Sequence, residues 1–158
     1  MIGSIVVDPF SIDLPPGTAD AADVAEEARR LLIELDRDVP GAVSLNAECR
    51  PPIDVVETAT AIEVVADVPG VPEHALRVAL RRGTLLVVGA KLAPAPDTSA
   101  RFHLAERSYG RFARAVRLTG AVQATRARAT LTGGQLRVVL PRLEERRGQV
   151  FRIPVDRA

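Results

Sequence analysis

The sequence predicts an all-β domain made of two packed sheets. Between residues 51 and 141, short segments alternate apolar and polar side chains, and proline or glycine turns separate them. No helical pattern inside that range is long enough to connect parallel strands, which argues against a doubly wound fold. Strands at this spacing are typical of a β-sandwich. We therefore expect an immunoglobulin-like β-sandwich between a partly helical N-terminal arm and an extended C-terminal tail.

The arm occupies residues 1–50 and contains one predicted amphipathic helix, over about 20–38. Prolines interrupt the residues before it, Thr18 or Asp20 can cap it, and Pro40-Gly41 ends it. Its apolar stripe consists of Val24, Ala28, Leu31, Leu32 and Leu35. Because a lone helix of this length is marginal in water, the stripe needs a cover: the domain, another subunit or a client chain. Packing within the protein's own assembly is the favoured interpretation.

The domain, residues 51–141, contains seven predicted strands. The first is expected to begin at residue 53. The other six are expected to cover residues 62–68, 76–81, 84–88, 112–118, 126–131 and 135–140. Gly133-Gly134 supplies the positive φ angles of the last hairpin. The fourth strand is predicted to end before Gly89, and the following segment, 90–103, is too long for a tight hairpin.

The tail, residues 142–158, combines a polar tether with an apolar end. Phe151, Ile153 and Val155 alternate with Arg152 and Pro154, so an extended chain places the three apolar groups on one face. Pro154 cannot donate a backbone hydrogen bond, which disfavours the interior of a sheet. The segment suits docking into a groove, and the expected partner is a second copy of the chain.

Composition excludes several functional classes. The chain has 158 residues, 47 % of them hydrophobic, which suits one domain with arms. No apolar run predicts a membrane span, no secretory signal is evident, and a cytoplasmic location is expected. Residues 1–100 carry 8 basic and 16 acidic groups (−8), whereas residues 101–158 carry 13 and 4 (+9). This asymmetry suggests either nucleic acid binding or, as we favour, contact between oppositely charged regions of an assembly.

Catalysis has little support in the sequence. His74 and His103 fall in a turn and a loop without a matched nucleophile, and the single cysteine, Cys49, has no partner in a catalytic motif. No G-x-x-x-x-G-K-[ST] segment is present, so no nucleotide site is expected. We expect neither an enzyme nor a bound cofactor or metal.

Five segments together resemble the small heat-shock proteins, the α-crystallin domain family. They are Ala129-Thr130-Leu131-Thr132-Gly133-Gly134-Gln135-Leu136 (A-x-x-x-x-G-x-L), Val68-Pro69-Gly70-Val71, Glu106-Arg107-Ser108-Tyr109-Gly110-Arg111-Phe112, Leu140-Pro141 and Ile153-Pro154-Val155. Each motif is weak alone, but all five occur in the family's order. The resemblance is to bacterial and plant members. It implies an ATP-independent holdase chaperone that binds unfolding client proteins, prevents their aggregation and works as a homo-oligomer built from dimers.

The resemblance also implies positions for the assembly contacts. The C-terminal motif Ile153, Pro154 and Val155 is expected to dock into a groove formed by Leu76, Val78, Leu80, Ala127, Ala129 and Leu131 of a neighbour. The dimer region is expected to include Phe102, Tyr109 and Arg114. The loop either carries a short strand, from about Ser99 to Leu104, that exchanges onto the partner, or is a flexible surface loop; the exchange is favoured. Arg114 either pairs with carboxylates there or reaches solvent as an edge-protecting charge.

Client binding is assigned to the arm, which is unusual in being aliphatic. The candidate residues are Ile5, Val7, Phe10, Leu31, Leu32 and Leu35. Before residue 51, Phe10 is the one aromatic residue and Met1 the one methionine, although the family's arms are often rich in both. Two other functions remain open: a monomeric co-chaperone or interaction module similar to the CS-domain proteins, and a nucleic-acid-binding protein that uses the basic C-terminal third.

Overall fold

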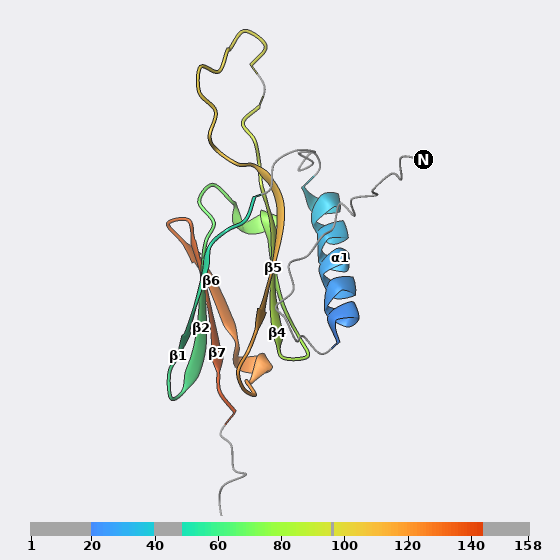
Figure 1. Cartoon of the computed structure of the whole chain (residues 1–158), viewed down its shortest axis with the longest axis vertical. Coiled ribbons are helices and arrows are strands. Elements are labelled where there is room, and N and C mark those ends of the chain that lie inside the picture. The colour runs from blue at the N-terminus through green and yellow to red at the C-terminus, as the bar shows by residue number, and fades with distance from the viewer. Residues whose placement is uncertain (1–19, 40–48, 96, 144–158) are drawn as a thin grey trace, which may run out of the picture.

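The computed structural model describes residues 20–39, 49–95 and 97–143, and it contains two antiparallel sheets and one helix (Figure 1). The elements are α1 (Ala21–Asp38), β1 (Ile53–Glu57), β2 (Ala61–Asp67), β3 (Leu76–Arg81), β4 (Thr84–Lys91), β5 (Gly110–Arg117), β6 (Arg128–Thr132) and β7 (Gln135–Pro141). Two single 3₁₀ turns, Glu73–Ala75 and Ala124–Arg126, precede β3 and β6. The predicted β-sandwich with an N-terminal helix is confirmed. Within the described residues, no helix is long and apolar enough to cross a membrane.

The strand order is β1-β2-β7-β6 in one sheet and β3-β4-β5 in the other. Every pairing is antiparallel. Tight turns join β3 to β4 and β6 to β7, and positive φ angles at Gly83, Gly133 and Gly134 allow those reversals. The outer strands are therefore β1 and β6 in the first sheet and β3 and β5 in the second, and each of these four strands has one edge that is not paired with another strand.

The core between the sheets follows the alternation of the sequence. Ile62, Val64 and Ala66 of β2 lie opposite Leu140, Val138 and Leu136 of β7, and all six are buried. Their neighbours in the same strands point outward and are half-buried or exposed. One face of this sheet is thus apolar and the other is polar, as expected of an antiparallel sheet with one solvated side.

In the other sheet, the central strand β4 is buried on both faces. All residues of β4 from Thr84 to Ala90 are buried. Arg77 and Arg111, which form ion pairs with α1, are register partners of Val88 and Ala90, so α1 lies on the Val88 face. Figure 1 shows the helix on the outer side of the layer containing β4 and β5. The molecule is therefore three layers thick at β4, and the stripe of α1 is buried against the domain.

Three local features differ from the prediction. β4 continues through Gly89 to Lys91, because it stays paired with β5 as far as Lys91 and Gly110. Gly89 fits inside the strand because the ring of Phe112 occupies the space of a side chain there: a Cβ at Gly89 would lie 2.5 Å from Phe112 Cζ. The loop consequently spans residues 92–109. β6 begins at Arg128, since residues 124–126 form the 3₁₀ turn. Asp20 is the N-cap residue of α1, but its side chain makes no capping hydrogen bond and its φ is 65°; Thr18 lies outside the described residues.

Candidate functional site

Two open edges of the sandwich are the candidate assembly sites. Hydrogen bonds tie β5 to the side of the molecule that carries β1: Thr119 Oγ1 donates to Glu57, and the guanidinium of Arg114 donates to the carbonyl of Pro51. The strand orders then place β3 and β6 along the opposite edge. Unpaired edge strands present free backbone donors and acceptors and invite pairing or docking.

The six residues predicted to form the docking groove lie along the edge formed by β3 and β6. Leu76, Val78 and Leu80 alternate on one face of β3, and all three are half-buried against the core. Ala127 and Leu131 are likewise half-buried, whereas Ala129 is exposed. The inward-facing apolar groups of this edge are thus only partly covered within a single chain. Residues Ile153, Pro154 and Val155 lie outside the described residues.

Two of the family-like motifs contact each other at one end of this edge. The amide of Val68 donates a 2.7 Å hydrogen bond to the carbonyl of Gly134. A Cβ at Gly134 would lie 2.9 Å from Pro69 Cα, and the φ of Gly134 is 79°. The glycine of A-x-x-x-x-G-x-L is therefore required by both its backbone conformation and the close approach of the Val68-Pro69-Gly70 turn.

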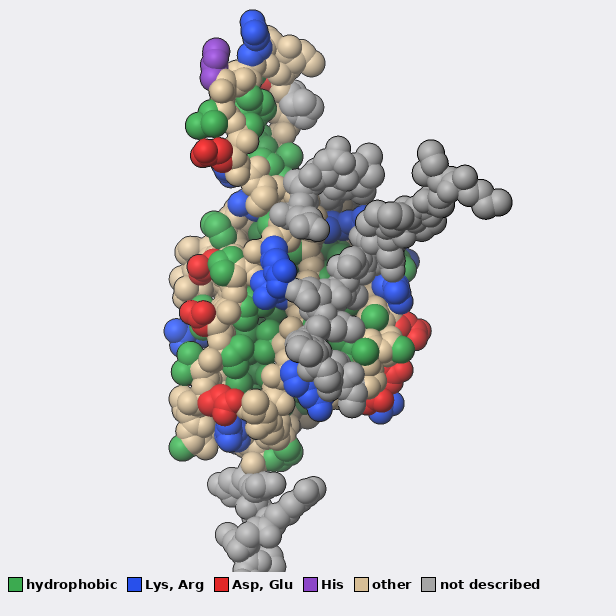
Figure 2. Space-filling view, in the orientation of Figure 1, with side chains coloured by type: hydrophobic (Ala, Val, Ile, Leu, Met, Phe, Trp, Pro, Cys, Tyr) green, Lys and Arg blue, Asp and Glu red, His purple; other side chains and the backbone are tan. Residues whose placement is uncertain are grey.

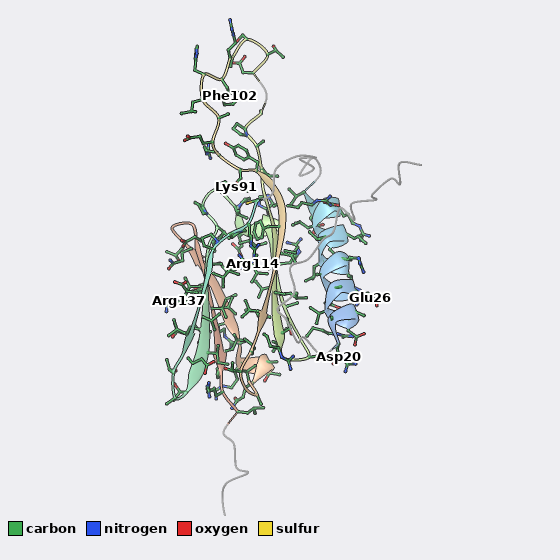
Figure 3. The ribbon with its side chains drawn as sticks, viewed as in Figure 1. Asp20, Glu26, Lys91, Phe102, Arg114 and Arg137 are labelled. Atoms are coloured by element: carbon green, nitrogen blue, oxygen red, sulfur yellow. The ribbon has the colours of Figure 1, made fainter. Side chains whose placement is uncertain are left out.

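The loop 92–109 extends beyond the body of the sandwich (Figures 1 and 3). Phe102 and Leu104 expose 83 % and 74 % of their surfaces, so the residues that the structure describes leave these apolar side chains uncovered. The described part of the loop forms no strand by itself. Asp97 organises its tip by accepting hydrogen bonds from the Ser99 hydroxyl (2.6 Å) and amide (2.9 Å), and these bonds lower the pKa of the Asp97 carboxyl.

The base of the loop meets the edge formed by β1 and β5. Two cations lie near the Tyr109 ring, with Arg107 Cζ 5.1 Å and Lys91 Nζ 5.8 Å from its centroid. Arg114 is partly buried and shares a face of β5 with Phe112 and Val116, as the alternation predicted. Figure 3 places Arg114 between the two layers, and Figure 2 shows apolar side chains along the seam between those layers.

β1 itself is the most exposed apolar strand of this edge. Val55 and Val56 expose 46 % and 50 % of their surfaces, and the sequence prediction did not select them. The signal was present in the sequence: Val55 and Val56 are adjacent and both apolar, so in a strand one of them must point away from the core. A strand of this composition at a free edge is a candidate for pairing with another chain.

Three of the six client-binding candidates are buried in the structure. Leu31, Leu32 and Leu35 expose 8 %, 4 % and 0 % and pack against the domain. They can contact another protein only when α1 separates from the sheet. Ile5, Val7 and Phe10 lie outside the described residues.

Ion pairs hold α1 at both of its ends. Near its start, Arg82 Nε lies 2.9 Å from Asp23 and Arg82 Nη1 lies 3.5 Å from Asp20. Near its end, Arg111 Nη1 lies 2.6 Å from Asp36, and Arg77 pairs with Asp38. The sequence prediction missed these arginines, although acidic residues at both ends of the helix and the unbroken apolar run of β4 were available signals.

Other ion pairs also join the acidic and basic parts of the chain. Arg137 pairs with Glu63 at 2.5 Å, and Arg142 pairs with Glu57 at 2.7 Å. Part of the charge asymmetry in the sequence is therefore neutralised inside one chain. Among the residues that the structure describes, no group of three or more His, Cys, Asp or Glu side chains could hold a metal ion. His74 and His103 are exposed and Cys49 is half-buried.

The arrangement defines a mostly β protein with the α-crystallin type of sandwich and one N-terminal helix. Residues 54–156 match the family model described as the Hsp20/alpha crystallin family. The chain belongs to this family, whose members are non-enzymatic chaperones.

Known relatives include plant and microbial proteins. The chain is 31 % identical over 154 residues to the 16.9 kDa class I heat shock protein 1 of Oryza sativa subsp. japonica, and the alignment covers 97 % of this chain and 95 % of that protein. Heat shock protein 16.0 from Schizosaccharomyces pombe has a similar structure, with a TM-score of 0.60 and 27 % sequence identity, and the match covers 69 % of this chain and 100 % of that protein. A small heat-shock protein from Xylella fastidiosa is also similar, with a TM-score of 0.61 and 25 % sequence identity, and the match covers 70 % of this chain and 100 % of that protein.

Proposed function

We propose that this protein is an ATP-independent holdase: a cytoplasmic homo-oligomer that binds unfolding proteins and prevents their aggregation. Family membership supports the chaperone role. The observation that carries the assembly proposal is the pair of open edges, each with incompletely covered apolar side chains. One edge would take the tail of a neighbouring subunit, and the other would take its loop.

The dimer is proposed to form through loop 92–109 and β1. Phe102 and Leu104 are exposed on the loop, while Val55 and Val56 are exposed on the strand. If the loop of each subunit pairs with the partner's β1, both apolar sets become covered and the edge of β1 gains a hydrogen-bonding partner. Tyr109 and Arg114 lie at the base of this contact, where they would fix the direction of the loop.

Dimers are proposed to join through the tail. Burying Ile153 and Val155 in the groove between β3 and β6 would contribute about 1.5–3 kcal/mol each. Ordering of the tether and loss of rotational freedom offset much of this gain. A single docked tail is then weak and exchangeable, whereas many tails in a closed assembly act together. The Xylella fastidiosa relative, described as having a distinct high order structure, supports an assembly larger than a dimer.

The size of the particle tests the assembly. The intact chain should form a large particle, and the chain ending at Gln149 should form a dimer-sized species, measured by light scattering. Ile153→Gly with Val155→Gly should reproduce the truncation, whereas the matched control Arg152→Gly with Asp156→Gly should leave the particle large. Unchanged mass in the first double variant would refute tail docking, and a monomeric intact chain would favour the CS-domain-like alternative.

Holding is tested separately, by light scattering from a heat-labile enzyme with increasing amounts of the chaperone. Wild type should suppress the scattering without ATP. Replacing Ile5, Val7 and Phe10 by serine should weaken suppression several-fold if the first part of the arm binds clients. Undiminished suppression would remove these three residues from the client site, and failure of the wild type to suppress would refute the holdase.

A further inference from the structure

The outer face of the β3-β4-β5 sheet has the construction of a binding site for an amphipathic helix, with α1 as its present occupant. Its apolar floor includes Leu86 and Val88 of β4 and, beside Leu86, Ala115 of β5, all at most 8 % exposed. Small side chains, Ala79 and Ala113, flank that floor and are half-buried. A floor of this kind accepts an aliphatic stripe without requiring one particular side chain, because hydrophobic burial is non-directional.

The rim of the same face is basic at both ends. Arg82, in the turn between β3 and β4, meets Asp20 and Asp23 at the start of α1. Arg111 and Arg77 meet Asp36 and Asp38 at its other end. The face therefore recognises a helix of about five turns, or roughly 27 Å, that carries carboxylates at both ends of an aliphatic stripe.

The acidic residues at the end of α1 are explained by this rim and not by the helix itself. Carboxylates near a helix C-terminus oppose the helix dipole, so Asp36 and Asp38 disfavour α1 as an isolated helix. They become favourable only beside Arg111 and Arg77. Formation of α1 is consequently coupled to docking, and the helix has no comparable stability once it leaves the sheet.

We propose that this face is a second client-binding surface, and that α1 covers it until a client displaces the helix. The client segment is an amphipathic helix with acidic residues flanking an aliphatic stripe, the chemistry that α1 presents. This inference rests on the proposed holdase function and names the partner class for one of its surfaces. Displacement also exposes Leu31, Leu32 and Leu35, so the outer face of the sheet and the apolar stripe of α1 become available to a client together.

The experiment uses the full-length chain and a fluorescent synthetic peptide with the sequence of residues 20–39. Leu31→Asp with Leu35→Asp places charges in the buried stripe and should detach α1 from its own sheet. This variant should bind the peptide at least tenfold more tightly than wild type does, and a scrambled peptide should not bind. Failure of the detached variant to bind the peptide, with cooperative unfolding of its sandwich retained, would overturn the proposal.

Charge exchange tests the rim. Arg77→Glu with Arg111→Glu, added to the detached variant, should weaken binding of the peptide about tenfold. A peptide with Asp36→Arg and Asp38→Arg should bind this charge-reversed variant with the affinity that the original peptide has for the detached variant. The same altered peptide should bind weakly to the detached variant that keeps Arg77 and Arg111. Equal affinities of both peptides for both rims would overturn the assigned specificity.

Wild type provides a second measurement should the detached variant not fold. Trypsin cleavage at Arg29 and Arg30, on the exposed side of α1, should accelerate when an excess of unlabelled peptide displaces the helix. This peptide carries Arg29→Gln, Arg30→Gln and Arg37→Gln, so that trypsin cannot cleave it. No acceleration at saturating peptide would count against displacement.

Clients complete the test. The peptide should compete with a client rich in acidic amphipathic helices and leave the holding of an all-β client unchanged. Competition with neither client, while wild type still suppresses aggregation, would overturn the inference and leave the holdase standing. Absence of suppression by wild type would instead refute the proposed function.

Discussion

The two sheets of the sandwich differ in how many of their faces are covered. In the sheet containing β2 and β7, buried and exposed side chains alternate, and the outer face meets solvent. In the other sheet, β4 is buried continuously from Thr84 to Ala90, because α1 lies on the face opposite the core. The comparison shows that an unbroken apolar run in an antiparallel strand indicates a second cover. Here that cover comes from the arm and not from the domain.

The largest effect should come from truncating a residue beneath the helix. Leu86→Ala should lower the free energy of unfolding by about 2–5 kcal/mol, since Leu86 is fully buried on the outer face of β4. Its matched control is Val65→Ala, on the solvated outer face of the other sheet, which should cost less than about 1 kcal/mol. Urea denaturation measures both. Equal small losses would show that α1 does not cover the sheet in solution.

A somewhat smaller loss is expected from overfilling the covered sheet. Gly89→Ala adds a Cβ that would lie 2.5 Å from Phe112 Cζ and 2.9 Å from the carbonyl oxygen of Ala75. The neighbours must move, which should cost about 1–3 kcal/mol. Gly120→Ala is the control, because nothing lies within 4 Å of its added Cβ. Thermal melting of both variants would decide the matter, and a wild-type Tm for the Gly89 variant would contradict the packing described.

In the other sheet, the two adjacent glycines of the β6-β7 turn should differ. Gly133→Ala and Gly134→Ala both place a side chain at positive φ, at a cost of about 1 kcal/mol. Only the second also brings a Cβ to 2.9 Å from Pro69 Cα. Gly134→Ala should therefore be the more destabilising by about 1 kcal/mol or more. The reverse order in chemical denaturation would argue against the contact between the two motifs.

The smallest effects should come from the surface ion pairs of the two sheets. Arg137→Ala removes the pair with Glu63 on the solvated sheet and should change stability by less than about 1 kcal/mol. Arg111→Ala, beside the covered face, should cost somewhat more, since the Arg111 side chain is only 20 % exposed, against 50 % for Arg137. High salt should reduce the first loss more than the second. If both variants lost the same stability with the same dependence on salt, the two ion pairs would not differ in their shielding from solvent.

Sequence patterns predicted the sheets better than they predicted what covers them. Strict alternation located β2 and β7, and the Pro69-Gly70 and Arg82-Gly83 turns separated strands correctly. Gly89 was wrongly predicted to end β4, because glycine usually interrupts a strand. The space it provides is filled by Phe112, which is 23 residues away in the sequence, and local patterns carry no information about that contact.

For the candidate site too, the sequence predicted which side chains share a face but not what those faces contact. Alternation placed Leu76, Val78 and Leu80 on one face, and placed Arg114 beside Val116. It could not assign a partner to the stripe of α1, because periodicity specifies an apolar face without specifying what meets it. It also could not find the ion-pair partners of the acidic residues at the two ends of the helix, since the three arginines opposite them come from separate places in the chain.

The position of β4 also makes this strand a natural reporter of global unfolding. It is hydrogen-bonded to β3 on one side and to β5 on the other, and both of its faces are shielded from water. In heavy water, amides of such a strand exchange only when the whole molecule opens, whereas amides of frayed or peripheral elements exchange through local fluctuations. Deuterium uptake at Leu86 and Val88 would thus time the complete opening of a subunit, even inside a large particle.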